Sequence, residues 1–190
     1  MLPRSFTEEQ AMFRDAYRKF LASEIVPHME TWREQGRVDR SAFEAAGAQG
    51  FLMVWPDEQY GGMGDEDFRF EQVIIEETAY ARCGDWYNTL HSRLVGPYLT
   101  RFGNEEQRQR FLPKAVRGEC IMAIAMTEPD AGSDLAGMRT SAVEHQDHWV
   151  LNGSKTYISN GINADLVFVA AKTDPDNNPH HMTIFMVERG

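Results

Sequence analysis

The sequence predicts an α+β fold in which an N-terminal all-α bundle is followed by an incomplete antiparallel β-barrel or sheet domain. Apolar residues recur at helical spacing over residues 1–118, whereas short β-rich runs separated by turn residues fill residues 119–190. Helices first and strands afterwards are typical of the α+β class rather than of alternating βαβ units. We therefore expect a helical domain over 1–118 and a β domain, truncated at its end, over 119–190.

Capping signals predict where the helices of the first domain begin. A capping side chain accepts a hydrogen bond from an amide of the first turn that has no partner within the helix. Pro27 should kink or end the first helix, and Gly103 and Gly118 should close two later ones. The predicted caps are Thr7 with Gln10, Ser41 with Glu44 before a helix ending near Gly50, Asp67, and Asn104 with Gln107.

Two further segments complete the helical domain. Trp86, Leu90, Leu94 and Tyr98 follow one another at four-residue steps and predict one helix that buries this face. Residues 56–64 contain three glycines and a proline, which predicts a tight connection where the backbone approaches another element. A structural turn without a ligand is the alternative for this segment.

The second domain should consist of short strands. A sheet of this size leaves an edge strand unpaired and apolar surface bare, which complete domains avoid. We therefore expect the chain to be a fragment that lacks a C-terminal helical domain, or a partner to complete the sheet. The predicted strands are residues 121–126, 149–151, 157–159, 166–171 and 182–187.

Composition narrows the classes of function. Apolar residues at 42% and charged residues at 25% are ordinary for a soluble globular protein, and a membrane span would need an apolar run of ~18 residues. Without a secretory segment behind the N-terminus, we expect a cytoplasmic protein. A net charge of −10 disfavours nucleic acid as a partner. We interpret Cys83 and Cys120 as buried, unreactive thiols.

The segment Met126–Asp134 predicts a ligand-binding loop after a strand. Thr127 offers a hydroxyl and an amide at the sheet edge, and residues 131–133 can direct several amides toward one point, as phosphate-binding loops do. We interpret Glu128 and Asp134 as acceptors that hold the loop. A plain β-turn is the alternative.

The segment Asn152–Gly161 predicts a second contact with the same ligand. Alternation along an extended strand would place Tyr157 and Ser159 on one face. The ring of Tyr157 could then lie against a planar ligand while Ser159 hydrogen-bonds one of its edge heteroatoms. A tyrosine in the core of a half-buried strand is the alternative. The two segments together predict a flavin site.

No metal site is expected. His145 with His148, and His180 with His181, are spaced as possible ligand pairs, but no nearby pattern supplies the further ligands that a metal needs. We interpret these histidines as residues of exposed loops.

The two predicted ligand segments, Met126–Asp134 and Asn152–Gly161, resemble segments of the acyl-CoA dehydrogenases, as do residues 56–64 and 102–107. Four motifs in the same order carry the resemblance, which covers the family's N-terminal helical domain and the first part of its middle β domain. It implies FAD as the cofactor and conversion of an acyl-CoA substrate to the trans-2-enoyl-CoA, as in fatty-acid β-oxidation. It also implies a homo-oligomer, usually a homotetramer, and an electron-transfer flavoprotein as electron acceptor.

The resemblance assigns cofactor contacts by position. Met126 and Thr127 would contact the flavin ring through backbone or hydroxyl groups. Gly132 and Ser133 would reach the pyrophosphate.

Two residues of the second segment complete the implied contacts. Tyr157 would pack on the ring face opposite the substrate, and Ser159 would hydrogen-bond near the flavin N5. Many members have Trp where Tyr157 stands and Thr where Ser159 stands; both exchanges preserve the kind of contact.

The resemblance assigns no catalytic base to this chain. In the family, the glutamate that removes the α-proton lies in the C-terminal bundle, so we expect residues 1–190 alone to be inactive. Glu76, Glu77 and Glu128 do not match its position, and we interpret them as solvated or loop-holding residues.

Two alternatives stay open. The first is a related flavin oxidase or monooxygenase of the same fold. It would lack the base glutamate, and oxygen would rapidly reoxidise its reduced flavin. A non-catalytic interaction protein is the second alternative, although it would leave the residues arranged for a flavin without a purpose.

Overall fold

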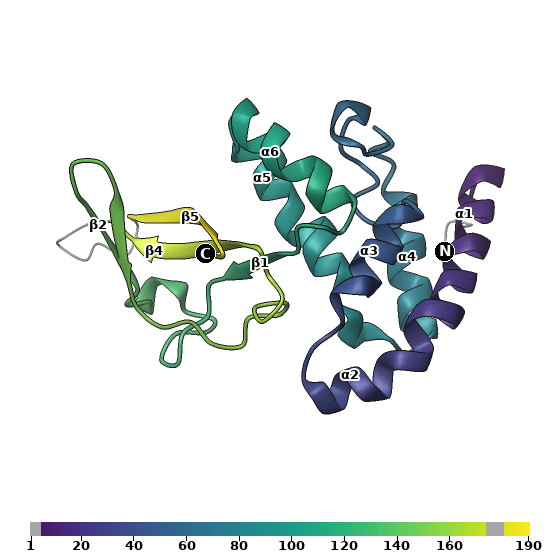
Figure 1. Cartoon of the computed structure of the whole chain (residues 1–190), viewed down its shortest axis with the longest axis horizontal. Helices are drawn as coiled ribbons and strands as arrows, with labels where there is room; N and C mark the ends of the chain where they lie inside the picture. The colour runs from purple at the N-terminus through teal and green to yellow at the C-terminus, as the bar shows by residue number, and fades with distance from the viewer. Residues whose placement is uncertain (1–4, 174–180) are drawn as a thin grey trace. The chain divides into compact units, whose positions relative to one another are not determined.

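The computed structural model in Figure 1 describes residues 5–173 and 181–190. The chain divides into a helical unit, Met1–Ile121, and a β unit, Met122–Gly190. Helices therefore precede strands, which confirms the predicted α+β class.

The first helix begins and is interrupted where the sequence predicts. In α1 (Glu8–Phe20) the amide of Gln10 donates to Thr7 Oγ1 at 3.2 Å, and the amide of Thr7 donates to Gln10 Oε1 at 3.1 Å. The chain then continues through a π-helical turn, η1 (Leu21–Ile25), and a 3₁₀ turn, η2 (Val26–His28). Pro27 lies in the 3₁₀ turn, which confirms the predicted interruption, because proline has no amide hydrogen for the helical ladder.

The predicted cap at Ser41 is wrong. Helix α3 (Arg40–Ala48) begins two residues earlier than a cap at Ser41 implies, because Asp39 adopts the extended backbone of a capping position at φ −69° and ψ 141°. Ser41 therefore lies inside the helix, whereas the helix does end near Gly50, as predicted.

The caps at Asp67 and Asn104 are confirmed. Asp67 accepts from the amide of Arg69 at 3.0 Å, and Asn104 forms a full capping box with Gln107. The remaining helices of the unit are α2 (Met29–Gln35), η3 (Glu58–Tyr60), α4 (Phe68–Tyr80), η4 (Gly84–Trp86), η5 (Leu90–Val95), α5 (Gly96–Phe102) and α6 (Glu105–Val116).

The helix expected around Leu94 has a different buried face from the predicted one. Its first part, η5, is π-helical, so each turn takes more residues than in an α-helix and a four-residue step no longer stays on one face. Leu94 is 53% exposed, whereas Val95 and Leu99 are fully buried. The four-residue spacing of apolar residues could not reveal this local widening.

Two substitutions test the rotated face. We expect Val95→Ala to lower the free energy of unfolding by about 2 kcal/mol, because it leaves a cavity, and Leu94→Ala to change it by less than about 0.5 kcal/mol. Urea unfolding followed by circular dichroism measures both. A larger cost for Leu94→Ala would show that the regular α-helical spacing holds in solution.

The core of the helical unit is aromatic. Helix α1 packs against α4 (Figure 1), and the buried indole of Trp86 lies 5.7 Å from the ring of Phe20 and 6.1 Å from that of Phe43. Cys83 and Cys120 are buried thiols, which confirms the predicted burial.

Glu77 is not the solvated residue that the sequence suggests. Its side chain is 4% exposed, and it forms ion pairs with Arg14 at 3.2 Å and Arg18 at 2.9 Å. Both arginines come from α1, so the acidic face of α4 is covered by a neighbouring helix.

The sheet of the β unit is mixed rather than antiparallel. Strand β4 pairs in parallel with β1 over Met122–Ala125 and at one position with β2, and antiparallel with β5 along its whole length. About forty residues separate β1 from β4, which is long enough for the crossover that parallel strands require. The strands are β1 (Met122–Ala125), β2 (Ser141–Glu144), β3 (Trp149–Asn152), β4 (Leu166–Lys172) and β5 (Met182–Glu188).

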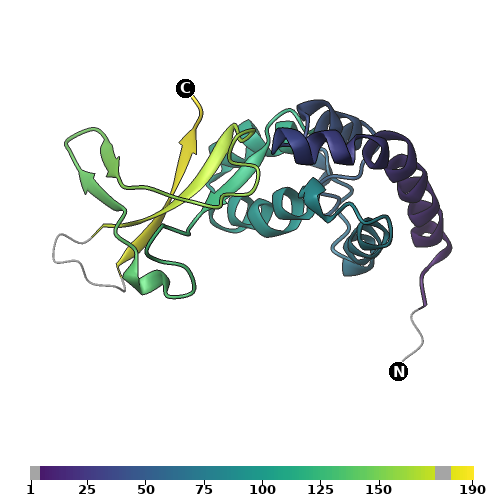
Figure 2. The same cartoon turned by 90° about the horizontal axis from the view of Figure 1, so that it is seen from below.

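Two strand predictions are wrong. Residues 157–159 form no strand, and β2 is a strand that the sequence does not predict, because Ser-Ala-Val-Glu is short and has only two apolar residues. Strand β2 forms because it pairs antiparallel with β3 in a hairpin, which Figure 2 shows beside the paired strands β4 and β5. Within the described ranges, the helices are too short or too polar to cross a membrane.

Candidate functional site

The structure brings the two predicted ligand segments together. Met126 and Thr127 follow β1 directly, and the carbonyl of Thr127 accepts a hydrogen bond from the amide of Thr156 at 3.0 Å. Beside this bond, Lys155 Nζ donates to the carbonyl oxygen of Met126 at 3.0 Å. Residues 126–127 therefore lie next to the start of the second segment, although 25 or more residues separate them in the chain.

Glu128 holds the first loop, as the sequence predicts. One carboxylate oxygen accepts from the amide of Arg139 at 2.6 Å; the other accepts from the amide of Thr140 at 2.9 Å and from Lys155 Nζ at 2.8 Å. Burial alone would raise the pKa of Glu128, but these donors outweigh it and lower the pKa to about 2. The side chain is therefore a carboxylate engaged by the loop and is not available as a base.

Tyr157 adopts an unusual conformation and is exposed. Its φ is 56°, in the left-handed region that bulky residues rarely adopt, and 91% of the residue is accessible. The alternative of a core tyrosine is therefore wrong, and so is the strand that would align it with Ser159, which lies in a turn and is half-buried. Strained backbone of this kind is frequent at ligand sites.

The loop of the first segment, Met126–Asp134, leaves its tip open. Glu128 and Ala131 exchange backbone hydrogen bonds at 2.8 and 3.2 Å across a tight turn, and exposed Asp130 pairs with Arg139 at 3.3 Å. Gly132 and Ser133 are exposed beyond this turn, and among the described residues none apart from the two chain neighbours of Gly132 lies within 4 Å of the point where its Cβ would stand. This space lets a ligand approach the backbone closely.

The predicted site is therefore assembled in part. Met126, Thr127 and the segment bearing Tyr157 are joined by hydrogen bonds. In the part of the chain that the structure describes, no hydrogen bond connects Gly132 or Ser133 with Tyr157 or Ser159. An exposed ring beside a strand end, with an open glycine-containing loop following, fits a planar ring system carrying a phosphate tail.

Sequence reasoning assigned no role to Lys155. Its side chain is only 11% exposed, and lysine is almost never buried unless it is paired. The sequence did contain a signal for this role. Lys155 stands two residues before Tyr157, the predicted ring contact, and the other residues of the segment Asn152–Gly161 are uncharged.

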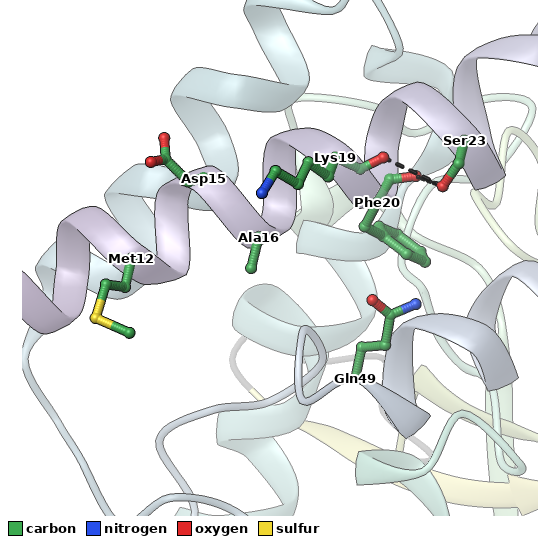
Figure 3. Close-up of a pocket in the computed structure, with 7 residues that line it drawn as sticks. All are labelled: Met12, Asp15, Ala16, Lys19, Phe20, Ser23 and Gln49. Carbon is green, nitrogen blue, oxygen red and sulfur yellow. Dashed lines mark hydrogen bonds between the residues drawn. The ribbon is translucent and has the colours of Figure 1, made fainter.

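A hollow of about 500 Å³ lies elsewhere, in the helical unit. Figure 3 shows its lining from α1, including Met12, Ala16 and Phe20, with Gln49 from the end of α3. It includes none of the predicted flavin contacts and is open to solvent, so we assign no part of the flavin site to it.

The histidines of the β2–β3 hairpin contact each other. His145 and His148 stack with ring centroids 5.2 Å apart, and His148 Nδ1 lies 2.6 Å from Asp147. Over residues 5–173 and 181–190, no three His, Cys, Asp or Glu side chains are grouped as a metal would require. His180 lies outside the described residues.

The fold defines a two-domain α+β class, a helical unit followed by a mixed-sheet unit, and comparison with known families specifies it. The model of the acyl-CoA dehydrogenase N-terminal domain matches residues 7–119, and that of the acyl-CoA dehydrogenase middle domain matches residues 123–190. The chain belongs to the acyl-CoA dehydrogenase family.

Individual relatives agree with this assignment. The long-chain specific acyl-CoA dehydrogenase of Sus scrofa mitochondria is 43% identical over 98% of this chain and 44% of its own length. The crystal structure of an acyl-CoA dehydrogenase from Geobacillus kaustophilus matches with a TM-score of 0.92 and 48% identity, over 98% of this chain and 49% of that one. A Bacillus anthracis acyl-CoA dehydrogenase complexed with FAD matches with a TM-score of 0.88 and 34% identity, over 99% of this chain and 32% of that one. The chain thus spans about half the length of the curated relative.

Proposed function

We propose that this chain supplies the FAD-holding part of an acyl-CoA dehydrogenase that converts an acyl-CoA thioester to its trans-2-enoyl-CoA. The observation that carries the proposal is the junction of residues 126–127 with residues 155–157, in a chain whose two units match the two family domains. The cofactor is FAD, which the FAD complex of a similar chain supports.

The residues of this chain bind and orient. We propose that Thr127 contacts the flavin ring and that Tyr157 covers one ring face, since its side chain is already exposed. Ser159 hydrogen-bonds the ring edge, and Gly132 and Ser133 present their amides to the diphosphate. A face covered by an aromatic ring excludes water, which leaves the opposite face for the substrate.

The chemistry is removal of two hydrogens from adjacent carbons. FAD, when bound, supplies the acceptor for the hydride from the β-carbon. A carboxylate must take the α-proton, and Glu128 cannot, because its oxygens are engaged by Lys155 and two backbone amides. We propose that the base lies in a further helical domain of a longer protein.

Exposed apolar residues on both faces of β5 support the proposal of a longer protein. Met182, Ile184 and Val187 are 41%, 37% and 38% exposed on a strand whose described pairing is with β4 alone. Further protein would cover such a strand, whether from the same chain or from a partner. The proposal includes a homotetramer, a cytoplasmic location and an electron-transfer flavoprotein as electron acceptor, as the family resemblance implies.

Anaerobic titration of the complete protein tests the activity. We expect the purified protein to be yellow, and a saturated long-chain acyl-CoA to bleach the flavin absorbance while the thioester loses two hydrogens, detected by mass spectrometry. A short branched acyl-CoA serves as the comparison for the substrate class.

Two results would contradict the proposal. FAD-loaded protein that reacts with no thioester would exclude dehydrogenation. The substrate could also reduce the flavin, and oxygen could then reoxidise it faster than an electron-transfer flavoprotein does. That result would favour the related oxidase or monooxygenase.

A further inference from the structure

Lys155 connects three separate segments of the β unit. Its ammonium contacts the Met126 carbonyl at 3.0 Å and Glu128 Oε1 at 2.8 Å. Glu128 in turn accepts the amides of Arg139 and Thr140. A single buried cation therefore joins the end of β1, the segment that enters β2 and the segment that carries Tyr157.

Burying this ion pair has a cost. The side chains of Lys155 and Glu128 are 11% and 5% exposed, so both have lost most of their hydration. The attraction between buried charges repays desolvation only in part, and apolar side chains of similar size often stabilise a fold as well. The pair therefore needs a reason other than stability, and conformational specificity is such a reason.

The segments that the pair joins carry the predicted ring contacts. Thr127 follows Met126, and Tyr157 stands two residues after Lys155. Tyr157 is 91% exposed in a left-handed backbone conformation, so packing of its side chain does not hold it in place. Its position depends on the contacts of the residues before it, namely the Lys155 ammonium and the hydrogen bond from Thr156 to Thr127.

We propose that Lys155 is a positioning residue for the flavin: by joining Met126 and Glu128 it holds Thr127 and Tyr157 in the arrangement that binds the ring. The ammonium also polarises the peptide group between Met126 and Thr127, which strengthens the amide of Thr127 as a donor. The inference rests on the proposed function, because it concerns the same FAD site.

The test measures FAD affinity in the complete protein. We expect Lys155→Met, which keeps the aliphatic stem and removes the charge, to raise the dissociation constant of FAD about tenfold or more, because misplaced contacts lose most of their binding energy. Quenching of flavin fluorescence on binding reports this constant. Arg139→Met is the matched control: it also removes one cation, but an exposed one, and its backbone amide to Glu128 remains. We expect the control to bind FAD within about twofold of the wild type.

A second variant separates positioning from folding. Lys155→Met leaves Glu128 buried and unpaired, which can unfold the protein. Lys155→Met/Glu128→Gln removes both charges of this pair, and the glutamine carbonyl can still accept a backbone amide. We expect this double variant to fold and still to bind FAD about tenfold more weakly. With FAD saturating, we expect its flavin reduction potential to be more negative than that of the wild type, because a weaker Thr127 donor stabilises the electron-rich reduced ring less.

The outcomes are distinct for the two proposals. Wild-type protein that binds no FAD would overturn the proposed function. Wild-type protein that binds FAD, together with a folded double variant of equal affinity and equal potential, would overturn the role of Lys155 and leave the proposed function standing.

Discussion

Replacing Glu71 by glutamine is expected to raise the free energy of unfolding near pH 8 by about 3 kcal/mol and to change it little near pH 4. Glu71 lies on α4 and is 1% exposed, and in the described part of the chain neither carboxylate oxygen has a hydrogen-bond partner. Burial raises its pKa to about 7 from an ordinary value of 4.5, and the guanidinium of Arg93 offsets only part of the rise.

The sign of the effect follows from the raised pKa. Below about pH 4.5 the carboxyl is protonated in both the folded and the unfolded chain, so ionisation contributes nothing to stability. As the pH rises toward 7, the unfolded chain loses the proton first, and each unit of pKa difference destabilises the folded state by about 1.4 kcal/mol. Above pH 7 both states are ionised and the penalty stays constant. Glutamine has the same shape and does not ionise.

Urea unfolding of the variant and the wild type at a series of pH values measures this difference. Glu44→Gln is the control, because Glu44 is exposed on α3, and we expect it to change stability by less than about 0.5 kcal/mol at each pH. A difference between Glu71→Gln and the wild type that does not grow with pH would show that Glu71 finds water or a partner in solution.

Gly118→Ala is expected to destabilise the helical unit by about 3 kcal/mol, several times the cost of the same change at Gly36. Both glycines follow a helix in the left-handed conformation, at φ 75° and 68°. A Cβ on Gly118 would lie 2.1 Å from the carbonyl oxygen of Phe43 in α3, whereas no described residue beyond the chain neighbours of Gly36 lies within 4 Å of the corresponding point there. The difference between the two variants therefore isolates the backbone contact from the conformational penalty.

Thermal and urea unfolding of both alanine variants measure this difference. We expect Gly36→Ala to cost about 1 kcal/mol, which is the penalty for a side chain in the left-handed region alone. Equal losses of stability in the two variants would contradict this prediction. They would mean that α3 moves away from the new methyl group at no cost, so that the short distance between Gly118 and the Phe43 carbonyl does not affect stability.

Local chemistry made much of the fold predictable. Thr7, Asp67 and Asn104 cap helices because their side chains reach amides only two or three residues ahead, a relation contained in a short stretch of chain. Pro27, Gly103 and Gly118 mark interruptions and ends for the same local reason. The two segments that we propose to bind FAD were also recognisable, because their turn residues and hydroxyls are adjacent in sequence, and both lie within the part of the chain that matches the family's middle domain.

Features that depend on distant neighbours could not be derived from residue types alone. The parallel pairing of β1 with β4 joins residues more than forty positions apart, and the π-helical turn at η5 moved burial from Leu94 to Val95. Tyr157 leaves the expected strand because its segment pairs with none of the described strands: the hydrogen bond from Thr156 and the ammonium of Lys155 hold it against the end of β1 instead. Residue types thus determined which segments could meet a flavin, whereas packing and buried charge, which arise only when the chain is folded, determined how those segments are held.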